Sequence, residues 1–176
     1  MTDQLAMMSR LKPSGDTAQT QLLPLELVAR EVARQLRDMA ERRAVEICIP
    51  DGLPVVEVDV AAMELILVNL VANAIKYSDP AKPARRVEIN ADSDAAACRL
   101  IVRDNGMGIA PEDLPRIFDR AFRAHAHRDR ELGTDGFGLG LAIVRDCIVD
   151  QGGEVAVESR VGEGTTFTVT LPRVGR

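Results

Sequence analysis

The stretch MELILVNLVANAIKY, residues 63 to 77, has the composition of a buried helix but carries two amide side chains. At 3.6 residues per turn, Asn69 and Asn73 lie one turn apart and share a stripe with Lys76 and Tyr77. A buried amide without a partner costs about 2 to 7 kcal/mol, so this stripe predicts a polar neighbour. Two interpretations remain open at this point: hydrogen bonds to nearby backbone, or a polar ligand.

The composition is that of an acidic globular chain of ordinary domain size. The 176 residues are 46% hydrophobic and 28% charged, with a net charge of −5. Because a nucleic-acid surface needs a basic face, this charge argues against such a partner. Cys48, Cys98 and Cys147 are far apart and the chain has only two histidines, so neither a zinc site nor a disulfide framework is indicated.

The hydropathy of the chain indicates a cytoplasmic protein. No uninterrupted apolar run approaches the roughly 20 residues that span a bilayer. The N-terminus also lacks the basic-then-apolar layout of a signal peptide. We therefore expect no membrane contact by this chain itself.

The periodicity alternates between helical and strand-like segments. Helices are predicted at 24–43, from Asp59 as N-cap to about 78–80, at 110–118 and at about 138–151. Strands are predicted at 45–49, 55–58, 85–92, 98–104, 154–160 and 164–172, the last two forming a hairpin. This order predicts an α/β two-layer sandwich, with helices on one face of a mixed, mostly antiparallel sheet.

Two glycine-rich turns indicate where a ligand could bind. DNGMGIA, residues 104–110, places Asp104 at a strand end, with Gly106 and Gly108 in the turn. DGFGLGLAIV, residues 135–144, opens a helix whose exposed N–H groups suit an anion. Its glycines are Gly136, Gly138 and Gly140. A P-loop or Rossmann site is disfavoured because neither fingerprint occurs in its required context.

Four segments carry a family resemblance. NLVANAIKYS, DNGMGIAPEDLPRIF, GFGLGLAIV and GEGTTFTVTLP resemble, in order and spacing, the conserved boxes of the catalytic, ATP-binding domain of histidine kinases. This domain belongs to the GHKL superfamily, together with the ATPase domains of gyrase and MutL. The resemblance covers about residues 24–172 and implies a Bergerat fold with a mobile ATP lid.

The resemblance implies a role for each polar residue of the 63–77 helix. In similar kinases the asparagines hold Mg²⁺ on the ATP phosphates, which would make Asn69 and Asn73 the metal ligands. Lys76 would offset phosphate charge, and Tyr77 would pack against the purine. Asp104 matches the aspartate that accepts a hydrogen bond from the adenine amino group.

Other positions are implied around the same nucleotide. They are Gly106, Gly108, Ile109, Arg123, Gly136, Gly138, Leu139, Gly140, Leu141 and Thr165. Residues 118–135 correspond to the lid, where relatives usually have two aromatics and this chain reads Ala121-Phe122. The lid arginines are candidates to meet phosphates, although a solvated charge run is the alternative interpretation. They are Arg120, Arg123, Arg128 and Arg130.

The implied chemistry is phosphoryl transfer to a histidine, with Asn69, Asn73 and Lys76 as catalytic residues. ATP-hydrolysing relatives carry a glutamate base where this chain has Asn69, and an amide cannot accept the proton. His125 and His127 lie in the lid segment and in no acceptor motif. The acceptor is therefore expected on a histidine-bearing dimerisation domain, in another polypeptide or upstream of Met1, with a response regulator downstream.

The first residues suggest how the chain relates to a larger kinase. Residues 1–15 resemble the end of a dimerisation-domain helix with its linker, which leaves 16–176 as the catalytic domain. A piece of a longer sensor kinase, a misplaced start codon and a split kinase acting in trans all fit, and the first would be the cytoplasmic part of a membrane-bound sensor. The alternative functions are an anti-sigma-factor-type serine kinase, a gyrase-type ATPase and a nucleotide-sensing interaction module.

Overall fold

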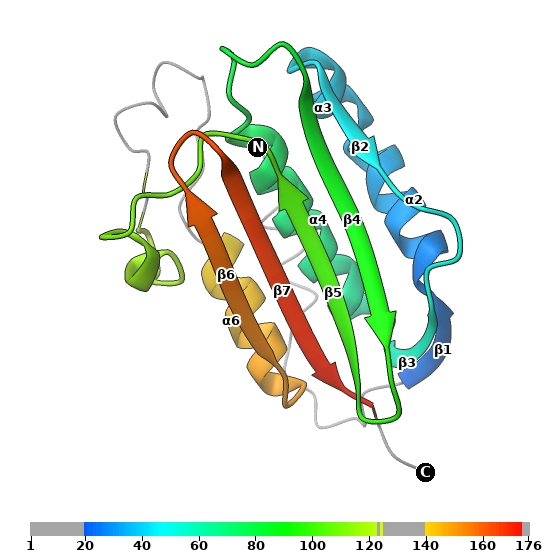
Figure 1. Cartoon of the computed structure of the whole chain (residues 1–176). Coiled ribbons are helices and arrows are strands. Elements are labelled where there is room, and N and C mark those ends of the chain that lie inside the picture. Colours follow the sequence, from blue (N-terminus) through cyan, green and yellow to red (C-terminus); the bar gives the residue numbers. More distant parts are fainter. Residues whose placement is uncertain (1–19, 123, 125–139, 174–176) are drawn as a thin grey trace.

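The computed structural model describes residues 20–122, 124 and 140–173, which form two layers (Figure 1). The strands are β1 (Thr20–Pro24), β2 (Val45–Cys48), β3 (Val55–Asp59), β4 (Arg85–Ser93), β5 (Ala97–Asp104), β6 (Glu154–Arg160) and β7 (Gly164–Pro172). The helices are α2 (Leu25–Gln35), α3 (Arg37–Arg42), α4 (Val60–Lys76) and α6 (Gly140–Asp150), with a 3₁₀ turn, η1, at Leu114–Arg116.

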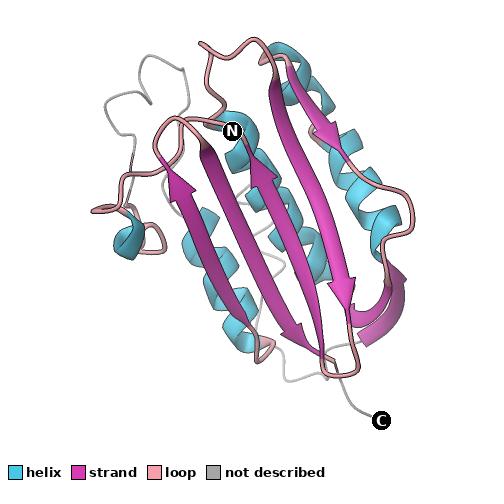
Figure 2. Ribbon diagram, viewed as in Figure 1, coloured by secondary structure: helices cyan, strands magenta, loops and turns pink. Residues whose placement is uncertain are grey.

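The main sheet has five strands in the order β2-β4-β5-β7-β6. Among the described strands of this sheet, β2 and β4 pair parallel and the other neighbours pair antiparallel. Figure 2 shows the four helices gathered on one face of this sheet. The predicted two-layer sandwich with a mixed, mostly antiparallel sheet is confirmed.

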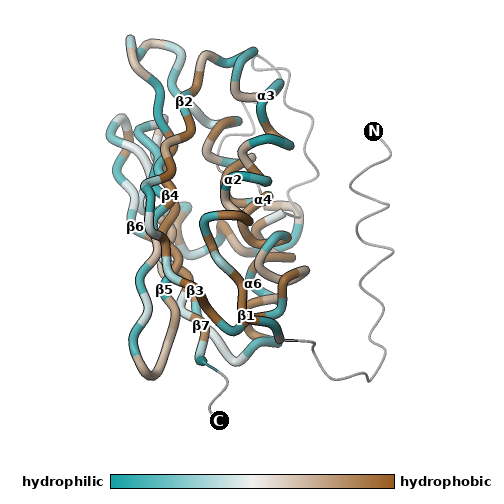
Figure 3. The backbone as a smooth tube through the Cα atoms, turned by 90° about the vertical axis from the view of Figure 1, so that its right-hand side faces the viewer, coloured by the Kyte–Doolittle hydropathy of each residue, from teal (hydrophilic) through white to brown (hydrophobic). Residues whose placement is uncertain are grey.

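The core lies between the sheet and the helices, with α4 at its centre. The apolar residues of α4 recur at three- and four-residue spacing, so they face the strands together. The buried residues of this helix are Ala62, Met63, Ile66, Leu67, Leu70, Val71, Ala74 and Ile75. In the edge-on view of Figure 3, hydrophobic stretches of strands and helices face one another across this interface.

The start of α4 is set by a side-chain cap, as predicted. Asp59 accepts a hydrogen bond from the backbone N–H of Ala62 at 2.9 Å, which satisfies one of the unpaired donors of the first turn. The last helical residue is Lys76, and Tyr77 forms the C-cap. The helix therefore ends just before the 78–80 segment where the proline predicted its end.

The structure differs from the predicted elements at three places. The helix predicted at 24–43 is two helices, because the backbone of Leu36 (φ −94°, ψ 6°) leaves the helical range. Strand β1 was not predicted; it pairs antiparallel with β3 in a separate two-stranded sheet. The short helix expected at 110–118 is only the three-residue η1. The helix predicted at about 138–151 is described over Gly140–Asp150, so its predicted end agrees within one residue and its predicted start lies outside the described residues.

Several predictions fall on residues that are not described. The proposed helix remnant at 1–15 and most of the lid lie outside the described residues. Within the described residues, no helix is long and apolar enough to cross a membrane.

Replacement of Asp59 by alanine tests the cap. We expect Asp59→Ala to lower the free energy of unfolding by about 1 kcal/mol, because the Ala62 N–H loses its acceptor. Urea denaturation followed by circular dichroism measures this loss. Asp59→Asn keeps a side-chain acceptor and serves as the control. Equal midpoints for Asp59→Ala and the wild type would contradict the cap.

Candidate functional site

The predicted site residues gather at one edge of the sheet. At the upper edge in Figure 1, strands β5 and β6 end, β4 and β7 begin, α4 ends and α6 begins. Asp104 at the end of β5 pairs in register with Thr165 on β7. Arg123, Gly136, Gly138 and Leu139 lie outside the described residues.

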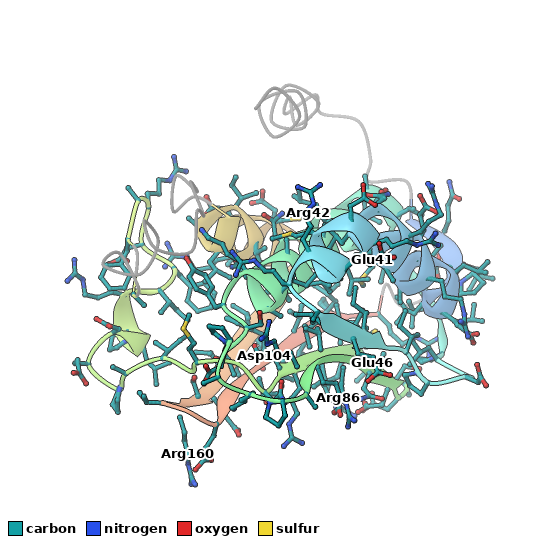
Figure 4. All side chains as sticks on the ribbon, turned by 90° about the horizontal axis from the view of Figure 1, so that it is seen from above. Glu41, Arg42, Glu46, Arg86, Asp104 and Arg160 are labelled. Atoms are coloured by element: carbon teal, nitrogen blue, oxygen red, sulfur yellow. The ribbon has the colours of Figure 1, made fainter. Side chains whose placement is uncertain are left out.

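Asp104 is a largely buried carboxylate, and two backbone N–H groups donate to one of its oxygens. Its Oδ1 accepts the backbone N–H of Gly106 at 2.8 Å and that of Thr165 at 3.3 Å. Burial raises the pKa of its carboxyl from 3.8 to about 6, although both hydrogen bonds and Lys82 act in the opposite direction. In Figure 4, Asp104 lies between the strands and the helices, whereas Arg160 extends away from them.

The glycine turn after β5 is wedged between two backbone segments. The N–H of Met107 donates to the carbonyl of Tyr77 at 3.0 Å, and the N–H of Gly162 donates to that of Met107 at 2.8 Å. Gly108 has a φ of +70°, and a Cβ there would lie 1.9 Å from the carbonyl oxygen of Arg160. Only glycine fits at this position. The glycine turn thus contacts Tyr77 at the end of α4 on one side and the turn between β6 and β7 on the other.

Asn69 combines the two interpretations that the sequence left open. Its Nδ2 donates to the backbone carbonyl of Leu65 at 2.8 Å, so the amide nitrogen is satisfied within α4. Its Oδ1 is directed at the start of α6, where a Cβ on Gly140 would lie 2.9 Å away. Asn73, one turn further on, is half-buried, and its side chain makes no hydrogen bond within the described part of the chain. Both amide oxygens therefore remain available as hard-cation ligands.

Lys76 and Tyr77 form a pair at the end of α4. The Lys76 ammonium lies 5.0 Å from the centroid of the Tyr77 ring, a cation–π distance. Both side chains are half-buried. Together with Asn69 and Asn73, they give this end of the helix a polar, positively charged stripe.

Among the residues that the structure describes, no acidic or thiolate metal site competes with the amides. Within residues 20–122, 124 and 140–173, no group of three or more His, Cys, Asp or Glu side chains could hold a metal ion. The three cysteines are free. A cation at this edge of the sheet would therefore be held by the amide oxygens and by oxygens of the molecule that binds with it.

Sequence reasoning missed Lys82, which joins the two turns of the site. Its Nζ donates to the carbonyls of Asn105, Gly106 at 3.3 Å and Glu163 at 3.4 Å. Three backbone acceptors around one ammonium hold the turn after β5 against the turn before β7. No motif indicates this role, because the three carbonyls belong to segments 23 to 81 residues away.

Sequence reasoning also missed Ser159, whose Oγ accepts the backbone N–H of Ile109 at 2.8 Å, and Asn105. The Asn105 side chain donates to the carbonyl of Ala84 at 2.9 Å and accepts the N–H of Arg86 at 2.8 Å. These bonds tie the turn after β5 to the beginning of β4. Asn105 is the middle residue of the DNG tripeptide, 104–106, which indicates a turn. This tripeptide is the one clue to the role of Asn105 in the sequence.

The described edge of the lid segment carries two ion pairs, Arg116–Asp119 and Arg120–Asp146, and one cation–π contact. Arg120 was a candidate to contact phosphates. In the structure it donates to the carboxylate of Asp146 on α6 at 3.2 Å and forms an ion pair with it. The guanidinium of Arg116 lies 4.4 Å from the centroid of the Phe122 ring. Ala121, where relatives usually have an aromatic, has a φ of 63°. The remaining candidate arginines of the lid, Arg123, Arg128 and Arg130, lie outside the described residues, as do His125 and His127.

This combination of a helix-backed antiparallel sheet, a buried aspartate beside a glycine turn and helix-borne amides defines a nucleotide-binding sandwich. The chain belongs to the family described as Histidine kinase-, DNA gyrase B-, and HSP90-like ATPase, whose model matches residues 58–175. The predicted family, the ATP-binding domain of histidine kinases, is thereby confirmed.

Individual relatives agree with this family. The Sensor protein SrrB of Staphylococcus aureus is 40% identical over 115 residues, which cover 65% of this chain and 19% of SrrB. The chain thus matches about a fifth of that relative's length.

Two solved structures are similar across most of the chain. ShkA, determined full-length in complex with AMPPNP, has a TM-score of 0.78 at 28% identity, covering 99% of this chain and 35% of its own. The mycobacterial sensor histidine kinase MprB has a TM-score of 0.68 at 26% identity, covering 89% of this chain and 100% of its own.

Removal of the Lys82 ammonium should loosen both turns of the site. We expect Lys82→Met to lower the free energy of unfolding by about 1 to 2 kcal/mol, because up to three hydrogen bonds are lost and three carbonyls lose their donor. Urea denaturation and amide exchange at Gly106 and Glu163 measure the effect. Lys82→Arg, which keeps the charge, is the control. Unchanged exchange in Lys82→Met would show that the bonds are unimportant.

The pKa of Asp104 predicts a pH-dependent stability. Between about pH 4 and pH 6 the native carboxyl retains a proton that the unfolded chain has released, so rising pH destabilises the native state. The full cost, of the order of 3 kcal/mol, is present above about pH 6.

Asp104→Asn removes this titration. We expect the variant to be more stable than the wild type at neutral pH, with the difference shrinking towards about pH 4. Urea denaturation across this range measures both proteins, and Asp38→Asn at an exposed position is the control. Parallel profiles of stability against pH for the wild type and Asp104→Asn would show that the pKa of Asp104 is not raised in the native state.

Proposed function

We propose that this chain is the catalytic ATP-binding domain of a sensor histidine kinase and that it transfers the γ-phosphate of ATP to a histidine outside its own residues. The observation that carries this proposal is the position of Asp104. Its Oδ1 is engaged by Gly106 and Thr165, while Oδ2 accepts no hydrogen bond within the described residues. A buried acceptor of this kind requires a donor from a ligand.

The charge of Asp104 supports recognition of adenine. With a pKa of about 6, the carboxyl is mostly ionised at neutral pH and presents only acceptors. The exocyclic amino group of adenine is a donor, whereas guanine carries a carbonyl at the same ring position. ATP is therefore the expected substrate, with Gly106, Gly108, Ile109 and Thr165 around its base.

The stripe on α4 supports binding of the phosphates. Asn69 and Asn73 offer amide oxygens to the Mg²⁺ that accompanies ATP, an ion that prefers oxygen ligands. The ion supplies charge neutralisation for the phosphates. Lys76 adds a positive charge beside Tyr77, and Tyr77 would pack against the purine. Glycines at the start of α6, with Leu139 and Leu141, would complete the phosphate cradle.

The identity of residue 69 supports transfer over hydrolysis. The family relatives that hydrolyse ATP need a glutamate base at this point, and the amide of Asn69 donates to its own helix instead. Phosphoryl transfer depends chiefly on positioning and charge, which Asn69, Asn73 and Lys76 provide. We therefore expect slow hydrolysis by the chain alone.

The partner implied by this chemistry is a dimerisation domain that bears the acceptor histidine. The relative SrrB is named a sensor protein, which supports a place in signal transduction with a response regulator as the next phosphoryl acceptor. The acceptor domain belongs either to the same polypeptide or to a partner that docks in trans. We propose that the reaction takes place in the cytoplasm.

Titration calorimetry with ATP and Mg²⁺ tests the proposal, with ADP production followed on the same sample. Tight binding with negligible turnover is expected, together with phosphoryl transfer once a histidine-bearing dimerisation domain is added. Transfer is followed with ATP labelled at the γ-phosphate. Absence of ATP binding would refute the proposal, and rapid turnover by the chain alone would refute the assignment of Asn69.

The amide of Asn73 is the sharpest test of the metal site. We expect Asn73→Ala to bind ATP with little response to Mg²⁺, because one oxygen ligand is lost, while its thermal stability stays near that of the wild type. Calorimetric titrations with and without Mg²⁺ measure this response. Asn90→Ala, at an exposed position on β4, is the matched control. A full Mg²⁺ response in Asn73→Ala would place the metal elsewhere.

A further inference from the structure

The hydroxyl of Ser159, on the inner face of β6, has an unusually complete set of partners. Its Oγ accepts the backbone N–H of Ile109 at 2.8 Å and donates to the carbonyl of Gly164 at 2.9 Å. It also lies 2.8 Å from the Oγ1 of Thr165, a contact in which either oxygen could donate. One side chain thus joins the glycine turn after β5 to the β6–β7 hairpin.

The proton count fixes the direction of the third hydrogen bond. A hydroxyl carries one proton and two lone pairs. The Ser159 proton is used on the Gly164 carbonyl, and the Ile109 N–H can only donate. Thr165 must therefore donate its own proton to Ser159. The Thr165 oxygen then has only lone pairs left for any other neighbour.

This orientation matters because Thr165 lies beside Asp104. The two residues face each other in the β5–β7 register, and the Thr165 N–H donates to Asp104 Oδ1 at 3.3 Å. Thr165 is 6% exposed, so bulk water offers little competition for its hydroxyl. The pocket therefore presents two acceptors side by side, a carboxylate and a hydroxyl oxygen whose proton is committed elsewhere.

We propose that Ser159 is a positioning residue for base selection: by holding Thr165 as an acceptor, it favours 6-amino purines and disfavours 6-oxo purines. The inference rests on the proposed function, since it concerns the same nucleotide site. An amino group has two N–H donors, one for each of these acceptors. A carbonyl would meet acceptors only, and an unmatched buried polar group is costly.

A purely structural role for Ser159 predicts a different result. If the hydroxyl only fastened two turns together, its loss would weaken every purine triphosphate by the same factor. In the proposed role, removing Ser159 frees the Thr165 proton to rotate towards the pocket and to donate to a carbonyl. The ratio of two affinities therefore separates the two roles.

Calorimetric titration of the full chain with ATP and with inosine triphosphate, both with Mg²⁺, is the experiment. We expect the wild type to prefer ATP, and Ser159→Ala to lose about threefold to tenfold in ATP affinity. The affinity for inosine triphosphate should hold or rise, so that the preference contracts. Ser93→Ala makes the same substitution in a strand where the side chain has no hydrogen bond within the described residues. It should behave as the wild type, and Ser159→Thr should retain the preference.

The outcomes distinguish this inference from the proposed function. A wild-type protein that binds neither nucleotide would overturn the proposed function and the inference with it. A wild type that prefers ATP, with the same preference in Ser159→Ala, would overturn the inference alone. If Ser159→Ala does not fold, Thr165→Val tests the same hydroxyl pair with a side chain of similar shape. An unchanged preference in Thr165→Val would likewise overturn the inference.

Discussion

A carboxylate held away from water at the end of β5 is the constraint around which this edge of the molecule is arranged. Burial of Asp104 opposes its ionisation strongly enough to raise its pKa to about 6. Two backbone N–H groups and a nearby ammonium reduce that cost without removing it. Each of these donors has to be brought to the carboxylate by a different segment. The turns, glycines and cross-links around Asp104 follow from that requirement.

The segments that supply those donors are held by close backbone contacts and by hydrogen bonds to backbone carbonyls, in addition to apolar packing. Gly108 lets the turn after β5 approach the end of β6, and Lys82 collects carbonyls from both turns. The apolar core reaches this edge through Ala74 and Ile75 in the last turn of α4. A site built in this way can keep its backbone donors fixed while the side chains above it meet a charged ligand.

Helix α4 shows how one element can serve both the core and the site. Its buried residues recur every three or four positions and face the strands, which leaves a narrow stripe for Asn69, Asn73 and Lys76. The sequence was sufficient to predict this helix, its cap and the sheet it packs on, because their patterns are local and periodic. It failed at β1, whose five residues acquire a strand partner only through β3. It also failed at Leu36, where one residue interrupts an otherwise continuous amphipathic pattern.

The same difference between local and distant information explains which residues of the candidate site could be predicted from the sequence. Asp104, Asn69 and Thr165 stand in motifs that can be read along the chain, whereas Lys82 and Ser159 act on residues up to 81 and 50 positions away. Most of their partners are backbone atoms, which leave no trace in side-chain patterns. The motif residues are those proposed to contact the ligand, and the residues that position them can be recognised only in the three-dimensional structure. Selectivity at such a site is therefore a property of the second group as much as of the first, since an acceptor is selective only while its own proton is committed elsewhere.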